Sequence, residues 1–150
     1  MKSGLGRRRA AKIPKLHVIL DRDAAGTAGT LAAIGWRVYE VSPLATDAEN
    51  IARAAQLGYS YVTMDTGTAH FRLAALPFTV VLGGNAQQSS STATAQIYEL
   101  RRLIREGEIT PGPQQRVKIT SEATKVETLD GAGRRVTRRI PNRTSRKRRL

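Results

Sequence analysis

Short apolar runs alternate with helix-like segments along the first two thirds of the chain. The runs at 16–20, 36–41, 59–64 and 78–82 have the length and the Val, Ile and Tyr content typical of strands. Helical spacing of apolar residues separates most of them. Strands that alternate with helices favour a mainly parallel sheet with right-handed crossovers, so the pattern predicts an α/β domain.

The helical segments carry their own start and stop signals. The Ala-rich segment at 24–34 closes at Gly35, and a second segment begins at Thr46 or Asp47 and closes at Gly58. We expect the Ser and Thr run that follows the loop at 83–91 to cap the last helix. The predicted helices are 24–34, 47–57, 70–75 and about 94–106.

Beyond a linker at 111–115 the period of the chain changes. RVKIT, KVETL and RRVTRRI read as short strands, and DGAG between the last two is a plausible hairpin loop. We therefore expect 111–140 to form a linker and a small, hairpin-like β extension, an appendage to the domain at 16–110.

Positive charge is concentrated at the two ends. The chain has 25 Lys plus Arg against 12 Asp plus Glu, yet 1–15 holds six basic residues and 134–150 holds nine, with no acid in either. The middle is close to neutral. We expect a basic arm at 1–15 and a basic tail at 141–150 that is disordered when free.

Composition also excludes several classes of protein. Without cysteine there is no disulfide framework, thiolate zinc site or cysteine nucleophile. No apolar run approaches the roughly 18 to 20 residues that span a membrane. The basic amino end leads into a short strand-like run with no cleavage-like site, so we expect no secretory signal and a cytoplasmic location.

Carboxylates occur where an α/β sheet presents functional side chains. Asp21 and Asp23 follow the first strand, Asp65 follows the third, and Asp47 and Glu49 open a helix. Parallel strands present their carboxyl ends at one edge, so separate loops can direct these acids to one point. Mg²⁺ and Mn²⁺ prefer such oxygen ligands. Each acid also has an ordinary reading, as a helix cap or a turn former.

In order and spacing, these motifs resemble the compact PIN-like nucleases. LDRD, GWRVYEV, TDAENIARAAQLG and YVTMDTGTAHF are similar to that family's LDEN, GHDV, SDEEI and VTRDKDF motifs, over about 90 residues from 16 to 105. The resemblance implies a three-layer α/β fold and a Mg²⁺ or Mn²⁺ dependent endonuclease, and we expect its substrate to be RNA. The chain departs from the family at Gly67, where a second acid is frequent, and at Asp23, where Asn is frequent.

The resemblance assigns roles to individual acids. Asp21 corresponds to the first catalytic aspartate, Asp47 or Glu49 to the acid at the helix start, and Asp65 to the acid after the third strand. We expect Asp21, Asp47 and Asp65 to be catalytic, with Asp23 and Glu49 as further metal ligands. Two alternatives stay open. One is a non-catalytic nucleic-acid-binding or ribosome-associated protein on a degenerate PIN-like fold.

The other alternative starts from LDRDAAGTAG, which is similar to the DxDxAG motif of Toprim domains. That fold needs a preceding strand with a catalytic Glu, and no Glu precedes Asp21. The PIN-like reading therefore accounts for more of the chain.

The basic ends suggest contact with a polyanion. Clusters of positive charge release counterions from phosphates, and they give affinity for nucleic acid with little dependence on its base sequence. An acidic inhibitor or antitoxin-type protein and a second copy of the chain are the other partners to consider. The residues expected to bind nucleic acid are Arg7, Arg8, Arg9, Arg134, Arg135, Arg138, Arg139, Arg143, Arg146, Lys147, Arg148 and Arg149.

Overall fold

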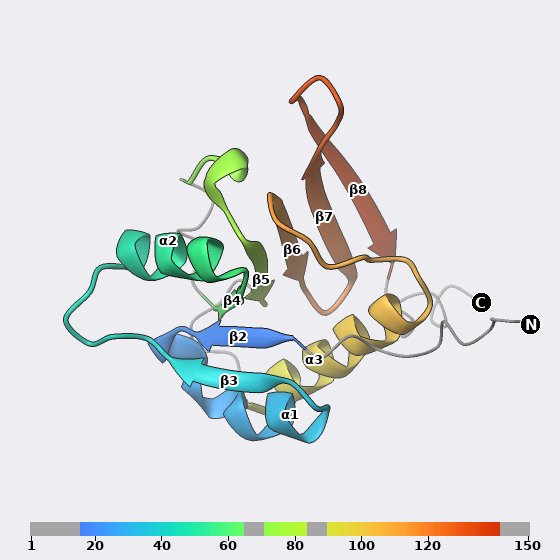
Figure 1. Ribbon diagram of the computed structural model, residues 1–150. Helices are drawn as coiled ribbons and strands as arrows, with labels where there is room; N and C mark the ends of the chain where they lie inside the picture. The colour runs from blue at the N-terminus through green and yellow to red at the C-terminus, as the bar shows by residue number, and fades with distance from the viewer. Residues whose placement is uncertain (1–15, 65–70, 84–89, 142–150) are drawn as a thin grey trace, which may run out of the picture.

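The computed structural model describes residues 16–64, 71–83 and 90–141. Within them the chain forms one mixed sheet, in the order β3-β2-β4-β5-β6-β7-β8 (Figure 1). Strands β3 to β6 are parallel, and β7 and β8 continue the sheet in antiparallel fashion. The strands are β2 (His17–Leu20), β3 (Arg37–Glu40), β4 (Ser60–Thr63), β5 (Phe78–Leu82), β6 (Gln115–Ile119), β7 (Ala123–Leu129) and β8 (Arg135–Pro141).

Helices cover the two faces of this sheet differently. In Figure 1, α1 and α3 lie beneath it and α2 lies above it. The larger core packs Leu31 of α1 and Ile97 of α3 against one face, and a smaller core packs Ile51 of α2 and Leu73 of η4 against the other. The helical elements are η2 (Arg22–Thr27), α1 (Ala28–Ala33), α2 (Asp47–Leu57), η4 (Leu73–Ala75) and α3 (Ser90–Arg105). The α/β prediction is confirmed, and the arrangement is compatible with three layers.

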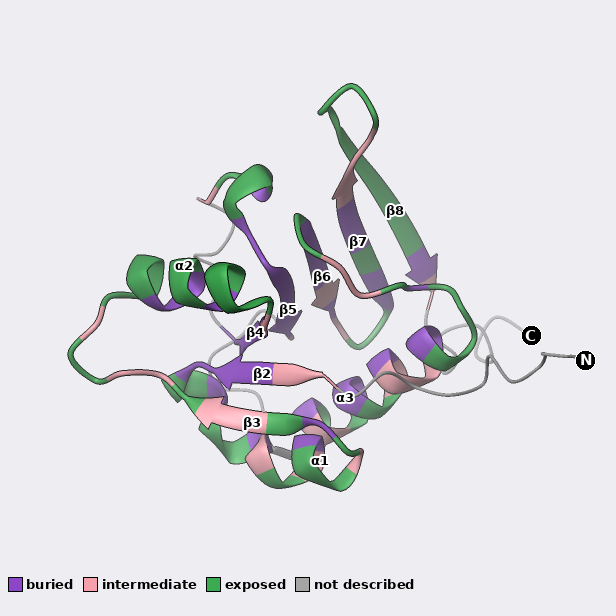
Figure 2. Cartoon of the chain, in the orientation of Figure 1, coloured by how far each residue is buried: buried purple, intermediate pink, exposed green. Residues whose placement is uncertain are grey.

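Burial follows the position of each strand in the sheet. Figure 2 shows β4 and β5 buried along their length, whereas most of β8 is exposed. None of the helices in the described part of the chain is long and apolar enough to cross a membrane.

The helix α2 forms as its local sequence predicts. Thr46 accepts a hydrogen bond from the backbone N–H of Glu49, and the Glu49 carboxylate accepts one from the backbone N–H of Thr46. This reciprocal pair satisfies two of the N–H groups that a helix start leaves unpaired. Gly58 ends the helix with φ of 72°, a left-handed conformation that glycine adopts without strain.

The helix predicted at 24–34 is shorter than expected. The chain first makes the 3-10 segment η2, and only Ala28–Ala33 is α-helical. The side chain of Asp21 accepts from the backbone N–H of Arg22, and the hydroxyl of Thr27 donates to the carbonyl of Ala24. These local bonds favour a tight turn over the first turn of an α-helix.

The C-terminal strands are part of the main sheet, so the expected β appendage is corrected. β6 pairs in parallel with β5 along its whole length. Val117 and Ile119 are fully buried in the larger core, against the face that α3 covers. The alternation that suggested an extension thus buries one side of each strand in the domain itself.

Two crossovers have opposite hands. Both β3 to β4 and β5 to β6 progress in the same direction across the sheet, but α2 lies on one face and α3 on the other. The expectation of uniformly right-handed crossovers is therefore wrong. The short α1 leaves much of its face uncovered, and the 16-residue α3 covers it beside α1.

A buried ion pair joins β6 to β7. Arg116 and Glu127 lie opposite each other, with Nε to Oε1 at 2.7 Å, and each is only 6% exposed. Burial by itself raises the pKa of Glu127, but the hydrogen bond and charge of Arg116 outweigh it, so this pKa lies below its ordinary value of 4.5. Lys125 and Arg135 add to the lowering.

Glu127→Gln should lower the free energy of unfolding at pH 7 by about 3 kcal/mol, because it removes the negative charge with which the buried Arg116 pairs. A folded-state pKa below the unfolded one means that the pair stabilises fully above pH 4.5 and is lost as the pH falls through the folded-state pKa. Urea unfolding of both proteins at several pH values measures this difference. A deficit that does not shrink in acid would contradict the assignment.

Candidate functional site

The chain reverses its direction across the sheet at β2. From β2 it moves outward to β3 through α1 and then returns to β4, on the other side of β2, through α2. The two connecting helices lie on opposite faces, and a cleft opens between the segments that follow β2 and β3 and the start of α2. Ligands of open α/β sheets bind at such a switch point.

Asp21 lies directly at this point. Its backbone N–H donates to the carbonyl of Val62 at 2.8 Å, which extends the parallel pairing of β2 and β4 by one residue. Asp21 therefore lies beside Thr63, on the face covered by α2. The residue is 8% exposed, so its carboxylate depends on protein donors.

Thr63 connects the two aspartates that follow β2. Its Oγ1 lies 2.8 Å from Oδ2 of Asp21 and 3.3 Å from Oδ1 of Asp23. A hydroxyl has one hydrogen, so these two bonds alternate. The backbone N–H of Met64 also donates to Asp23 at 3.0 Å, and that of Arg22 donates to Asp21 at 2.7 Å. These donors hold the two carboxylates side by side.

The start of α2 supplies a third acid. Asp47, the first residue of the helix, faces the same cleft of about 590 Å³ as Asp21 and Asp23. Glu49 does not line it, because its carboxylate caps the helix start. The cleft is lined by Asp21, Arg22, Asp23, Val41, Ser42, Ala45, Thr46, Asp47 and Asn50.

Tyr61 is a residue of this site that the sequence did not reveal. Its side chain is 1% exposed, and its hydroxyl has no hydrogen-bond partner of good geometry among the described residues. Burial, and then the charges of Asp21 and Asp47, raise the pKa of Tyr61 above its ordinary value. The hydroxyl is thus a buried donor that stays protonated among acids.

The structure brings together some of the predicted site residues and separates others. Asp21, Asp23 and Asp47 share the cleft, whereas Glu49 belongs to the helix cap. Asp65 lies outside the described residues, directly after Met64. In the part of the chain that the structure describes, no three His, Asp or Glu side chains are close enough to form a metal-binding group.

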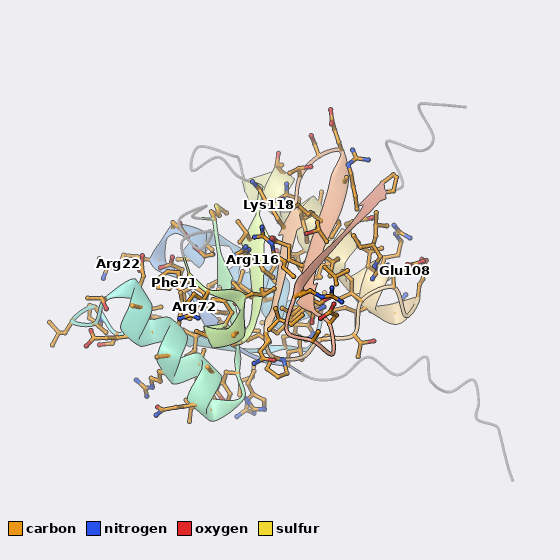
Figure 3. All side chains as sticks on the ribbon, turned by 90° about the horizontal axis from the view of Figure 1, so that it is seen from above. Arg22, Phe71, Arg72, Glu108, Arg116 and Lys118 are labelled. Atoms are coloured by element: carbon orange, nitrogen blue, oxygen red, sulfur yellow. The ribbon has the colours of Figure 1, made fainter. Side chains whose placement is uncertain are left out.

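The predicted nucleic-acid-binding residues on β8 differ in their surroundings. Arg138 pairs with Glu108 at 3.2 Å, and Arg134 pairs with Asp130 at 3.1 Å (Glu108 is labelled in Figure 3). Arg135 contacts the buried Glu127 at 3.4 Å. Arg139 makes no ion pair with another described residue. Those outside the described ranges are Arg7, Arg8, Arg9, Arg143, Arg146, Lys147, Arg148 and Arg149.

Comparison of the chain with protein-family models, with curated proteins and with solved structures finds no match. The likeness to PIN-like nucleases is therefore an inference from motifs, and the site has to be argued from its own geometry.

Thr63→Val should lower the free energy of unfolding by about 1 to 3 kcal/mol, because a largely buried carboxylate loses a hydrogen-bond donor. Thr63→Ser keeps the hydroxyl and is the matched control, with a smaller loss. Denaturant titration of the three proteins checks the prediction. Equal stability of the Val variant and the wild type would mean that the hydroxyl does not hold the aspartates in place.

Proposed function

We propose that this protein is a PIN-like, divalent-metal-dependent nuclease that hydrolyses phosphodiester bonds, in RNA in preference to DNA. The observation that carries the proposal is the convergence of Asp21, Asp23 and Asp47 on one cleft at the switch point of the sheet. Three carboxylates around one cleft repel one another, and a cation offsets that repulsion.

The chemistry of the donor set fits Mg²⁺ or Mn²⁺. Asp21, Asp23 and Asp47, together with Asp65, would hold the ion, which activates water and stabilises charge on the phosphate when it is bound. The unsatisfied hydroxyl of Tyr61 agrees with this reading, because buried donors are nearly always satisfied and a water or phosphate oxygen in the cleft would accept its hydrogen bond.

The residues of the chain have separate tasks in this scheme. Thr63 holds Asp21 and Asp23 at a fixed separation, which spares the cost of ordering them when the ion binds. Tyr61 positions an oxygen next to Asp21. Arg22, at the rim of the cleft, brings a positive charge toward the phosphate.

A second candidate function is nucleic-acid binding without hydrolysis. Its support is that Asp23 accepts the backbone N–H of Met64 and the Thr63 hydroxyl, contacts that also serve simply to fasten η2 to the end of β4. In either case we place the activity in the cytoplasm. An acidic inhibitor or antitoxin-type protein is then a candidate regulator, and a homodimer a candidate assembly.

Asp21→Asn and Asp47→Asn should each reduce Mn²⁺-dependent cleavage of single-stranded RNA on the order of 10²-fold or more, because each keeps the side-chain shape and removes charge. Glu106→Gln, which breaks only a surface pair on α3, is the matched control and should keep full activity. Cleavage is followed with a labelled RNA. Wild-type rates in both Asp variants would exclude the nuclease, and RNA binding without cleavage in every protein would favour the second function.

Mn²⁺ should raise the melting temperature of the wild type, because a cation that binds only the folded state stabilises it, by about 2.7 kcal/mol at 100 times Kd. The Asp21→Asn variant should lose that gain. Calorimetry with and without Mn²⁺ measures both proteins. A wild type that melts at the same temperature in each buffer would contradict a metal site.

A further inference from the structure

Strand pairing places a row of cations in line with the candidate site. Thr63 of β4 pairs with Val81 of β5, and Val81 pairs with Lys118 of β6. Lys118 lies opposite Lys125 of β7, which lies opposite Arg139 of β8. Directly paired residues project from the same face of a sheet. The three cations, called the cationic row below, therefore share one face with Thr63.

This face is the one that α2 covers near β2 and β4. Figure 3 views the molecule from that side, and Lys118 and Arg116 lie along β6. Adjacent strands are about 4.8 Å apart, so Lys118 lies about 10 Å from Thr63 along the pairing direction. The buried Val81 occupies the strand between them.

In the described part of the chain the cationic row outweighs the acid beside it, Glu127, which interacts with Lys125 but also with two arginines. Lys125 and Arg139 are exposed, and no member of the row forms a hydrogen bond or ion pair with another described residue. The acid next to it, Glu127, is already held by Arg116 at 2.7 Å and by Arg135 at 3.4 Å. Like charges directly opposite each other on neighbouring strands are destabilising. A sheet that carries three of them in register is stabilised by an anion lying across it.

The surroundings of the row favour a phosphate backbone over a protein. Protein interfaces have an apolar centre. The exposed large apolar residue of β8, Val136, projects from the opposite face, because it alternates with Arg135 and Thr137. The apolar residues of the row's own face, such as Leu73 and Leu129, belong to the smaller core, and the row itself offers charge, which is how nucleic-acid backbones are held.

We propose that the cationic row binds the phosphate backbone of a nucleic-acid strand that runs across β6, β7 and β8 toward the cleft of Asp21. Lys118, Lys125 and Arg139 each contact a phosphate. The direction of the strand toward the cleft rests on the proposed nuclease function. Its test measures binding without hydrolysis, so that the cationic row and the nuclease function can be contradicted independently.

The test is the salt dependence of binding to a fluorescent single-stranded RNA in EDTA, with the full chain. The triple variant Lys118→Gln, Lys125→Gln, Arg139→Gln removes the row. The control Arg37→Gln, Arg53→Gln, Arg105→Gln removes the same net charge from exposed residues of β3, α2 and α3, away from the row. Each lost phosphate contact reduces the slope of log K against log salt by about 0.7. The slope of the row variant should therefore be smaller by about 2, and that of the control should change much less.

The outcomes separate cleanly. A shallower slope confined to the row variant supports the proposal. Equal loss in both triple variants would mean that net charge alone drives binding, and an unchanged slope in the row variant would mean that the face contacts something other than nucleic acid; either result overturns it. The double variant Lys125→Gln, Arg139→Gln changes only exposed side chains and should lose about 1.4, even if the substitution of Lys118 disturbs the fold.

If the wild type binds RNA with the expected slope in EDTA but never cleaves it in Mn²⁺, the nuclease proposal fails and the cationic row stands.

Discussion

The register between β2 and β4 is the constraint on which the site depends. It places Asp21 beside Thr63, and the Thr63 hydroxyl then holds Asp21 and Asp23 together. A shift of one residue would turn Asp21 to the other face, away from α2 and Asp47. Because α1 follows β2 on one face and α2 follows β3 on the other, this is also the point at which the cleft opens.

The same line of paired residues continues across the sheet, and the charge of its side chains changes from negative to positive. Near β2 and β4 the α2 face carries acids, and beyond the buried Val81 it carries the cationic row. Two residues toward the amino end of β6, the charges of Arg116 and Glu127 cancel in a buried ion pair. The face thus has an acidic end and a basic end, and the proposed nuclease would use both.

Local signals allowed much of the fold to be predicted from the sequence. The helix α2 was predicted with its caps because Thr46, Glu49 and Gly58 act within their own turns. Strand β5 was predicted with its bounds because an apolar run of β-branched residues is bounded by Pro77 and Gly83. The position of Asp21 and Asp23 at the cleft beyond β2 followed from the rule on carboxyl ends.

What the sequence could not provide depends on contacts between distant segments. Whether β6 joined the sheet or formed an appendage is decided by its pairing with β5, which has no local signal. Tyr61 resembled any core residue of a strand until Asp21 and Asp47 were placed around it. Lys118 and Lys125 stood outside the basic ends of the chain, and only the register aligned them with Arg139.

In the proposed function, Asp21 and the acids beside it at the switch point hold a divalent ion. A crystal structure with Mn²⁺, recorded with anomalous scattering, tests it most directly. We expect an anomalous peak in the cleft within about 2.5 Å of a carboxylate oxygen of Asp21, with Asp47 or Asp65 as a further ligand of the same ion. Crystals with Mn²⁺ at saturating concentration and no peak in this cleft would contradict it.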